Sequence, residues 1–172
     1  QIDGAERYLM TSLKTTVEKS KADEVSVYGI QDDSDYLNID FPSDGVYTSE
    51  EYLDKYELSV GDVITLKEKY SDKTYDFKIK GTYKYPAGLA IFMNDDEYRK
   101  VFDKDSEYYT GYFSDEELTD IDSNYIYTKI TEDDLTKTTR QLKVSMGGMV
   151  ELVEIFAIIM FIILVYLLTK II

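Results

Sequence analysis

Hydrophobic and polar side chains alternate most regularly over residues 73–85, KTYDFKIKGTYKY. The large apolar and aromatic side chains occupy odd positions: Tyr75, Phe77, Ile79, Tyr83 and Tyr85. The even positions between them carry Thr, Asp and Lys. Because successive side chains of a strand point to opposite faces, this pattern predicts one half-buried antiparallel β-strand. The SDK stretch at 71–73 predicts a hairpin turn that connects it to an earlier strand at 63–69.

Shorter runs rich in β-branched and aromatic residues predict the remaining strands. They lie at 24–30, 36–41, 46–47, 89–94, 108–113 and 124–130. The spacing differs at 5–20, where Leu9, Leu13 and Val17 recur every four residues. That spacing places the three side chains on one helical face, so a helix is predicted there.

Three further helices are predicted from their start signals. Ser49 precedes a short helix at 50–56, and Asn94 or Asp95 precedes another at 95–102. Thr131, with Asp134 three residues later, resembles a capping box that opens a long final helix. No internal repeat is visible in the sequence. The predicted fold class is therefore α+β, with mostly antiparallel short strands, a few helices and one C-terminal transmembrane helix.

The last 18 residues, IFAIIMFIILVYLLTKII at 155–172, are almost entirely apolar. As a helix they would extend about 27 Å, close to the roughly 30 Å hydrocarbon core of a bilayer. A buried core helix is the alternative, but such a helix usually keeps one polar stripe, and this segment has none. We therefore expect a membrane-entry segment and transmembrane helix at 144–172, after an extracytoplasmic α+β domain at 1–143 whose residues 1–20 form a possible stalk helix.

The charge distribution separates the two predicted regions. Residues 1–154 hold all 34 Asp and Glu residues but 18 of the 19 Lys and Arg residues, a net charge of −16. This charge repels phosphate backbones, which argues against nucleic acid as a partner. Lys170 is a single positive-inside signal, so the acidic domain is expected outside the cell, on a protein of the cell membrane. Because the chain begins with Gln1, it is expected to be a piece of a longer protein.

The residue types restrict the possible chemistry. The chain has no Cys and no His, which excludes Ser-His-Asp and Cys-His catalysis and the usual zinc sites within it. Acidic clusters occur mostly in loops and first helical turns, where solvation and the helix dipole account for them. The run from Asp103 resembles a calcium loop at two positions, but Tyr108 stands where Gly is required. We expect no enzyme activity and no catalytic, cofactor-binding or metal-binding residue.

Tyrosine is abundant, with 17 residues in the chain. Tyrosine suits adaptable contact surfaces, because it offers a large face at low entropic cost. Strand spacing nevertheless favours a structural role on the sheet for four of them: Tyr75, Tyr83, Tyr125 and Tyr127.

Lys137, Arg140 and Lys143 lie on one side of the predicted final helix, just before its apolar part. They are candidates for contacts with anionic headgroups, with an ordinary solvated face as the equally supported alternative. Gly147 and Gly148 follow as a possible hinge.

The stretch VYTSEEYLDKYELSVGDVITLKEKYSDKTYDFKIKGTY at 46–83 resembles the extracytoplasmic domain of FtsX-like and MacB-like ABC transporter permeases. In that family a short Ser-Glu helix leads to a Leu-x-x-Gly-Asp turn and then to a strand that ends in a Val-x-Gly step. The matching residues here are Ser49, Glu50, Leu53, Lys55, Leu58, Gly61, Asp62, Ile64, Leu66, Ile79 and Gly81, with Ile79 in place of the usual Val. The run through Met146 and Met149 into the apolar tail is similar to the start of the family's membrane module, so the resemblance covers roughly 24–172.

The resemblance implies a non-enzymatic permease subunit whose partners are membrane lipid and a cytoplasmic ATP-binding subunit. ATPase-driven motion of the membrane helices would be coupled to substrate or partner handling outside the cell: peptide, lipid or lipoprotein export, or control of cell-wall hydrolases. A helix continuous across 131–172 would transmit this motion, and a joint at Gly147–Gly148 would damp it. The alternatives are the extracellular sensor domain of a membrane receptor and a surface-anchored binding protein. The sequence after Ile172 would distinguish them, because only a permease requires further membrane spans.

Overall fold

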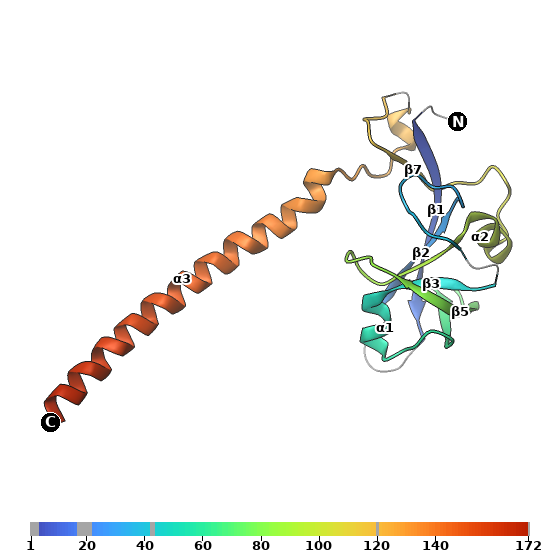
Figure 1. The fold of residues 1–172 in the computed structure, drawn as a ribbon. Coiled ribbons are helices and arrows are strands. Elements are labelled where there is room, and N and C mark those ends of the chain that lie inside the picture. Colours follow the sequence, from blue (N-terminus) through green and yellow to red (C-terminus); the bar gives the residue numbers. More distant parts are fainter. Residues whose placement is uncertain (1–3, 17–21, 42–43, 120, 172) are drawn as a thin grey trace. The chain divides into compact units, whose positions relative to one another are not determined.

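The computed structural model describes residues 4–16, 22–41, 44–119 and 121–171, with the side chains of 135–151 and 171 outside the description. The chain divides into two compact units, Gln1–Leu118 and Thr119–Ile172. The first unit contains the strands and two helices. The second unit is dominated by one long helix (Figure 1).

The first unit follows a strand-rich order. Its strands are β1 (Ala5–Thr15), β2 (Glu24–Ile30), β3 (Val46–Ser49), β4 (Val63–Glu68), β5 (Thr74–Tyr83), β6 (Ala90–Asn94) and β7 (Gly111–Ser114). Its helices are α1 (Glu50–Tyr56) and α2 (Asp95–Phe102). The second unit holds a short 3₁₀ helix η1 (Ser123–Tyr125) and the 40-residue helix α3 (Glu132–Ile171). The α+β class is confirmed, and so are the strands predicted at 24–30, 46–47, 63–69 and 89–94.

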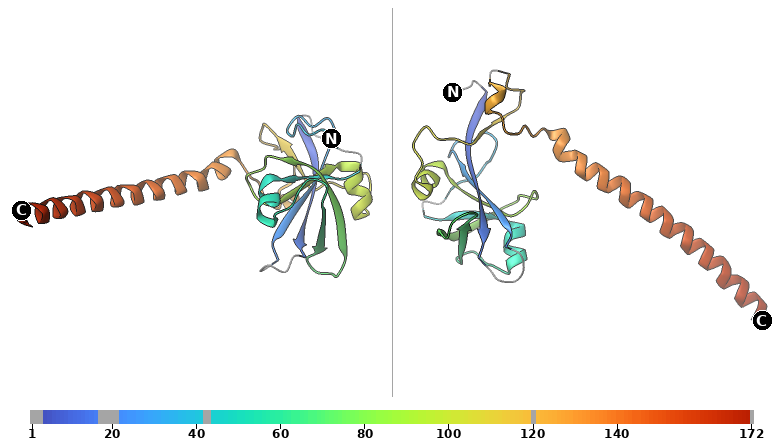
Figure 2. Two further views of the ribbon diagram at one scale, coloured as in Figure 1. Left: turned by 60° about the horizontal axis from the view of Figure 1, so that its bottom comes forward. Right: turned by 180° about the vertical axis from the view of Figure 1, so that it is seen from behind.

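Six of the strands close into a barrel. The sheet order is β2-β6-β3-β5-β4-β1-β7, and an additional pairing of β2 with β1 joins the ring. The barrel's curved strands are seen in both views of Figure 2. The pairs β2–β6 and β3–β5 are parallel, and the other pairings are antiparallel. Strand β7 pairs with the first part of β1, outside the ring.

The barrel is built from two halves with the same topology. Each half has an antiparallel hairpin, a third strand and a short helix: β1-β2-β3-α1, then β4-β5-β6-α2. Exchanging β1, β2 and β3 with β4, β5 and β6 interchanges β1–β2 with β4–β5 and β2–β6 with β3–β5. The β1–β4 and β3–β6 pairings map onto themselves, and the Tyr47–Phe92 pair lies at the centre of the exchange. Each helix also ends in a left-handed residue, Glu57 in one half and Asp103 in the other.

The main core fills the barrel's interior. Its members come from alternate positions of the strands and from the inner faces of the two helices, as expected for period-two burial. They are Leu9, Leu13, Val25, Val27, Val46, Tyr52, Ile64, Leu66, Phe77, Ile79, Ile91, Met93 and Tyr98. A second, smaller cluster around Ile39, Ala90 and Phe92 lies on the opposite face of the sheet.

The predicted helix at 5–20 is wrong, because residues 5–15 form β1. The spacing of Leu9 and Leu13 fits both periods, since positions four apart also share a strand face. In the structure both side chains are buried in the barrel. Strand β1 is selected by its partners, because it pairs with β2, β4 and β7. Residues 1–3 and 17–20 of the predicted stalk helix lie outside the described residues.

The alternation along β5 is real, but it does not keep one face. Val46 pairs with Ile79 while Tyr47 pairs with Gly81, so a β-bulge inserts one extra residue on β5. A bulge shifts the side-chain alternation by one position. Phe77 and Ile79 therefore lie in the interior core, whereas Tyr83 and Tyr85 pack in the cluster around Phe92.

Two predicted strands are absent from the described chain. Residues 36–41 form an irregular segment in which the N–H groups of Tyr36 and Leu37 both donate to Ser34 Oγ. Such local bonds compete with strand pairing. Residues 124–130 hold the end of η1 and then irregular backbone. Tyr125 and Tyr127 are exposed, so their predicted place on a sheet face is wrong. The strand predicted at 108–113 begins later, at Gly111.

Candidate functional site

The residues of the resemblance motif meet along β5. Ser49 pairs with Tyr83 across the parallel β3–β5 ladder, and Gly81 pairs with Tyr47. A Cβ atom on Gly81 would lie 2.1 Å from Cε1 of the Tyr47 ring, so only glycine leaves room for that ring. Because the backbone φ of Gly81 is not positive, the requirement is one of space rather than of conformation.

The Gly-Asp turn is attached to the same strand. Gly61 has φ 106°, a conformation that favours glycine, and its N–H donates to the carbonyl of Ile79 at 2.9 Å. The N–H of Ile79 donates in return to the carbonyl of Asp62, also at 2.9 Å. The Asp62 carboxylate accepts the N–H of Ser59 at 2.8 Å and so closes the turn on itself. Gly61 and Asp62 thus hold the turn against β5 rather than presenting chemistry to solvent.

Ser49 is the N-cap residue of α1, as predicted, but its side chain makes no cap hydrogen bond. Its buried hydroxyl instead accepts the N–H of Ala90 at 3.1 Å, which ties β3 to the start of β6. Glu50 is exposed in the first turn of α1, and Leu58 packs against the interior core. Ser49, Leu58, Gly61, Asp62 and Gly81 thus make packing or hydrogen-bond contacts within the first unit, whereas no contact of the exposed Glu50 is described.

A polar cluster fastens α1 to the β1–β2 hairpin. The Lys55 ammonium lies 2.6 Å from the Asp23 carboxylate, and the Tyr56 hydroxyl donates to the same carboxylate. Lys55, and next Tyr56, hold the pKa of Asp23 below its usual value. Burial, followed by the bond to Asp23, raises the pKa of Tyr56.

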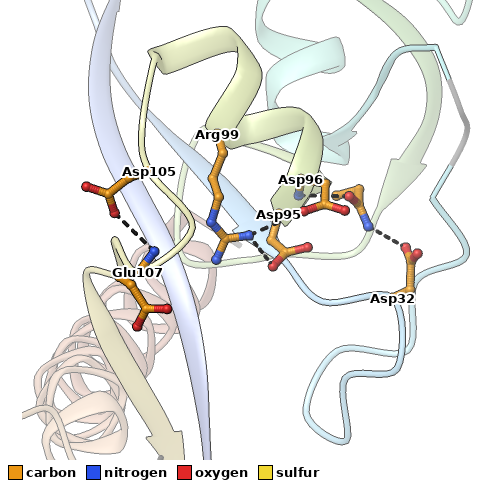
Figure 3. A network of polar contacts seen from close by, with 7 residues as sticks. Asp32, Asp95, Asp96, Arg99, Asp105 and Glu107 are labelled. Carbon is orange, nitrogen blue, oxygen red and sulfur yellow. Dashed lines mark hydrogen bonds and ion pairs between the residues drawn. The ribbon is translucent and has the colours of Figure 1, made fainter.

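A second polar network surrounds the start of α2 (Figure 3). Asn94 accepts the N–H of Asp96 at 2.9 Å through its side chain, and its amide donates to Asp32 at 2.6 Å. Asn94 is thus the cap residue, as predicted. Arg99 reaches back one helical turn to Asp95 at 2.5 Å. These acidic side chains stabilise the positive N-terminal end of α2. Among the described residues, no group of His, Cys, Asp and Glu side chains that could hold a metal ion is found.

An aromatic pocket lies on the outer face of the barrel. It has a volume of about 200 Å³ and is lined by Tyr28, Tyr36, Leu37, Tyr85, Phe92 and Phe113. Sequence reasoning missed it, because its residues come from β2, β6, β7, the irregular segment 36–41 and the chain after β5. Part of the signal was present: Tyr28 and Phe92 stand at strand positions opposite in parity to those that build the interior core.

A second hollow, of about 210 Å³, lies beside α2 and is lined by its residues Glu97 and Val101. Its lining includes Asp44, Asp76, Lys78 and Glu97 beside Phe77 and Met93. Burial raises the pKa of Glu97. Lys78 in the same wall supplies the opposite charge, so the hollow has mixed polarity and offers no evident selectivity.

Within the described residues one helix is long and apolar enough to cross a membrane. The candidate span is Leu152–Lys170, 19 residues with mean hydropathy 2.8 and no part buried within the protein. A buried core helix would instead have most of this segment enclosed. Thr131 and Asp134 form the predicted capping box: the N–H of Thr131 donates to Asp134 Oδ2 at 3.0 Å, and the N–H of Asp134 donates to Thr131 Oγ1 at 3.3 Å.

The other predicted site residues of this region lie on α3. The side chains of Lys137, Arg140 and Lys143 lie outside the described residues, so headgroup contact stays a prediction. The helical backbone is continuous at Gly147 and Gly148. A hinge there likewise stays a prediction.

A scan against protein-family models matches no family, and a search of curated proteins finds no significant match to this chain.

Proposed function

We propose that this chain is the extracytoplasmic domain and following membrane helix of an ABC transporter permease subunit of the FtsX/MacB type. In this role it is not an enzyme. It couples helix motion, driven by a cytoplasmic ATP-binding subunit, to the handling of a peptide, lipid or protein partner outside the cell. The observation that carries the proposal is the unbroken helix α3, which contains the membrane span and extends well beyond it.

The dimensions of α3 suit mechanical coupling. Its 40 residues correspond to about 60 Å, of which the 19-residue span takes about 28 Å. The 20 residues from Glu132 to Glu151 add about 30 Å on the N-terminal side of the span. A continuous helix of this length transmits a displacement at one end to the other, because its backbone hydrogen bonds resist compression.

The clustered resemblance motif supports the permease type. Ser49, Gly61 and Gly81 were singled out from the sequence alone, and all three make contacts that shape β5 or its neighbours. The external placement of the domain comes from the resemblance, in which this domain is extracytoplasmic.

Membrane topology is the first test. The chain has no cysteine, so Tyr70→Cys creates a single label site on a side chain that is 92% exposed. In intact cells a membrane-impermeant maleimide should label this variant as fully as it does after lysis, with the unsubstituted chain as the unlabelled control. Labelling that appears only after lysis would place the domain in the cytoplasm and overturn the proposal.

The second test concerns the partner. The protein purified from its own membranes in mild detergent should carry a separate ATP-hydrolysing subunit. Absence of that subunit, together with external labelling of Tyr70→Cys, would exclude the permease type and favour a sensor or surface-anchored binding domain. The aromatic pocket is the specific observation that favours this second class, because a sensor requires a ligand site.

A further inference from the structure

The aromatic pocket has walls made of closely packed rings. Tyr28 stacks on Phe92 at 5.3 Å between ring centroids, and Tyr85 meets Phe92 edge-on at the same distance. The ring centroids of Tyr36 and Phe113, two further lining residues, lie 5.7 Å apart. The lining therefore presents several ring faces and edges in a small space. Ring faces carry negative quadrupole potential, which attracts cations.

The polar atoms of the pocket are also suited to a cation. The hydroxyls of Tyr28 and Tyr85 lie 3.2 Å apart, so one of them donates to the other. Burial, and then this hydrogen bond, raises the pKa of Tyr28, so its hydroxyl stays neutral at physiological pH. Oxygen lone pairs of such neutral hydroxyls can face a positive group without adding a competing charge.

A shielded carboxylate stands beside the pocket. Glu6 Oε2 accepts the N–H of Asp35, the residue before Tyr36, at 3.0 Å. Glu6 is also the cross-strand partner of Phe113 in the β1–β7 pair, so the two side chains share one face. Its other oxygen, Oε1, is shielded from solvent and has no hydrogen-bond partner among the described residues. A carboxylate oxygen that is shielded from water and unpaired favours a positive group nearby.

No Lys or Arg side chain in the described part of the chain is found over a ring of the pocket. Among the described residues, the Lys and Arg groups found over aromatic rings contact Tyr56, Tyr70, Tyr75, Tyr108, Tyr109 and Tyr166. None of these rings lines the pocket. The rings of the pocket therefore remain available to a cation supplied from solution.

We infer that the aromatic pocket binds a small soluble organic cation that carries a quaternary or methylated ammonium group. The inference rests on the pocket alone and does not depend on the proposed permease role. An apolar cavity of roughly 150 Å³ accommodates a benzene-sized molecule, so about 200 Å³ suits a trimethylammonium group. The net charge of −16 before residue 155 raises the local concentration of cations and disfavours anionic ligands.

Choline and its neutral isostere 3,3-dimethylbutan-1-ol test the inference directly, because they share a shape and differ in charge. Binding is measured by calorimetry on the full chain in a maltoside detergent, with no choline-containing lipid or detergent present. We expect choline to bind and the neutral isostere to bind at least tenfold more weakly. Equal binding of both would show a merely apolar pocket, and no binding of choline would overturn the inference.

Three variants locate the site. Tyr36→Ala should weaken choline binding roughly tenfold, whereas Tyr36→Phe should restore it, since the ring face makes the contact. Glu6→Gln should weaken binding several-fold, because the amide oxygen can keep the bond to Asp35 while the charge is lost. Tyr70→Ala, an exposed tyrosine on the β4–β5 hairpin, is the matched control and should bind as the unsubstituted chain does.

The same variants distinguish the aromatic pocket from a cation site elsewhere on the protein. Each must show the same unfolding temperature as the unsubstituted chain to within a few degrees before its affinity is compared. Choline binding that Tyr36→Ala and Glu6→Gln leave unchanged would place the cation elsewhere and overturn the assignment. Binding seen only with bilayers of phosphatidylcholine would mean that the pocket recognises a lipid headgroup. It would contradict the inference that the ligand is a soluble cation.

Discussion

Gly81 lies directly against the ring of Tyr47, where a methyl group would overlap the ring. Gly81→Ala must therefore displace the ring or the strand, at a cost of about 1–3 kcal/mol in the free energy of unfolding. We expect a lower unfolding temperature in near-UV circular dichroism, a signal that the tyrosines dominate because the chain has no tryptophan.

The ring itself provides the control for Gly81→Ala. In the double variant Tyr47→Val, Gly81→Ala, the overlap is gone, so the two substitutions should be less destabilising together than their separate effects add up to. In Tyr47→Phe, Gly81→Ala the ring remains, and no such relief is expected. Additive effects in both double variants would show that the Tyr47 ring is not what requires glycine at position 81.

Asp23 makes the stability of the barrel sensitive to acid. Its pKa is lowered in the folded protein by Lys55 and Tyr56, so the folded state binds its proton less readily than the unfolded state does. This contribution is complete above the unfolded pKa, near 3.8, and is lost as the pH falls through the lower folded value.

Asp23→Asn should accordingly destabilise the protein at pH 7, and the difference from the unsubstituted chain should shrink below about pH 4. Urea unfolding of both proteins at a series of pH values measures this difference in the free energy of unfolding. Asp54→Asn, an exposed position on α1, is the control and should change the midpoint little. An Asp23→Asn effect that is the same at pH 3 and pH 7 would contradict the assignment.

At the scale of single residues, the sequence predicts best where one local rule decides. The positive φ of Gly61 and the cap at Asn94 follow from turn and helix-end chemistry within a few residues. The role of Ser49 could not be predicted, because its hydroxyl partner is the N–H of Ala90, 41 residues away in the chain. The aromatic pocket is unpredictable for the same reason, since its walls come together only when the barrel closes.

Among the elements, α2 has the clearest local determinant. Asn94 makes two separable contacts, one to the N–H of Asp96 and one to Asp32 in the preceding loop. Asn94→Ala removes both and should cost about 1 kcal/mol or more. Asn94→Ser retains a cap acceptor and loses only Asp32, so it should cost less. Urea unfolding of the two variants compares them, and equal losses would mean that the cap contributes nothing.

Strand β1 shows where element prediction fails. Its sequence is compatible with a helix, because Leu9 and Leu13 satisfy both spacings. The choice is made by tertiary pairing, since three different strands bond to β1 along its 11 residues. The elements predicted correctly, such as β6 and α2, have strong local signals at both ends. In β5 the alternation predicted the strand, whereas the bulge beside Gly81 depends on the register with β3 and was not predicted.

At the scale of the whole molecule, the candidate membrane span of α3 predicts how the effect of a charge depends on its position along the helix. Phe161→Lys places a charge at the middle of Leu152–Lys170, where it should cost roughly 2.5–3.5 kcal/mol of insertion free energy. Val153→Lys places the same charge near the end, where its long side chain can reach the interface. Carbonate extraction of membranes should therefore release Phe161→Lys far more readily than Val153→Lys. Equal retention of both would argue against a spanning helix.

The repeated topology was not predicted from the sequence. What correspond are the pairings and the helix ends, including the left-handed residues Glu57 and Asp103. A core that requires only apolar side chains at alternate positions tolerates extensive substitution, so a shared architecture leaves little shared sequence.

The pairing pattern also means that the third strand of each half is bonded to strands of the other half. Among the described strands, β3 bonds to β5 and β6 alone, and β6 bonds to β2 and β3 alone. Neither half could therefore close a sheet of its own. A chain nicked in the exposed turn between α1 and β4 should stay assembled, and the two fragments made separately should be unfolded until they are mixed. The two halves of this single chain therefore depend on each other to fold, as the two subunits of an obligate heterodimer do.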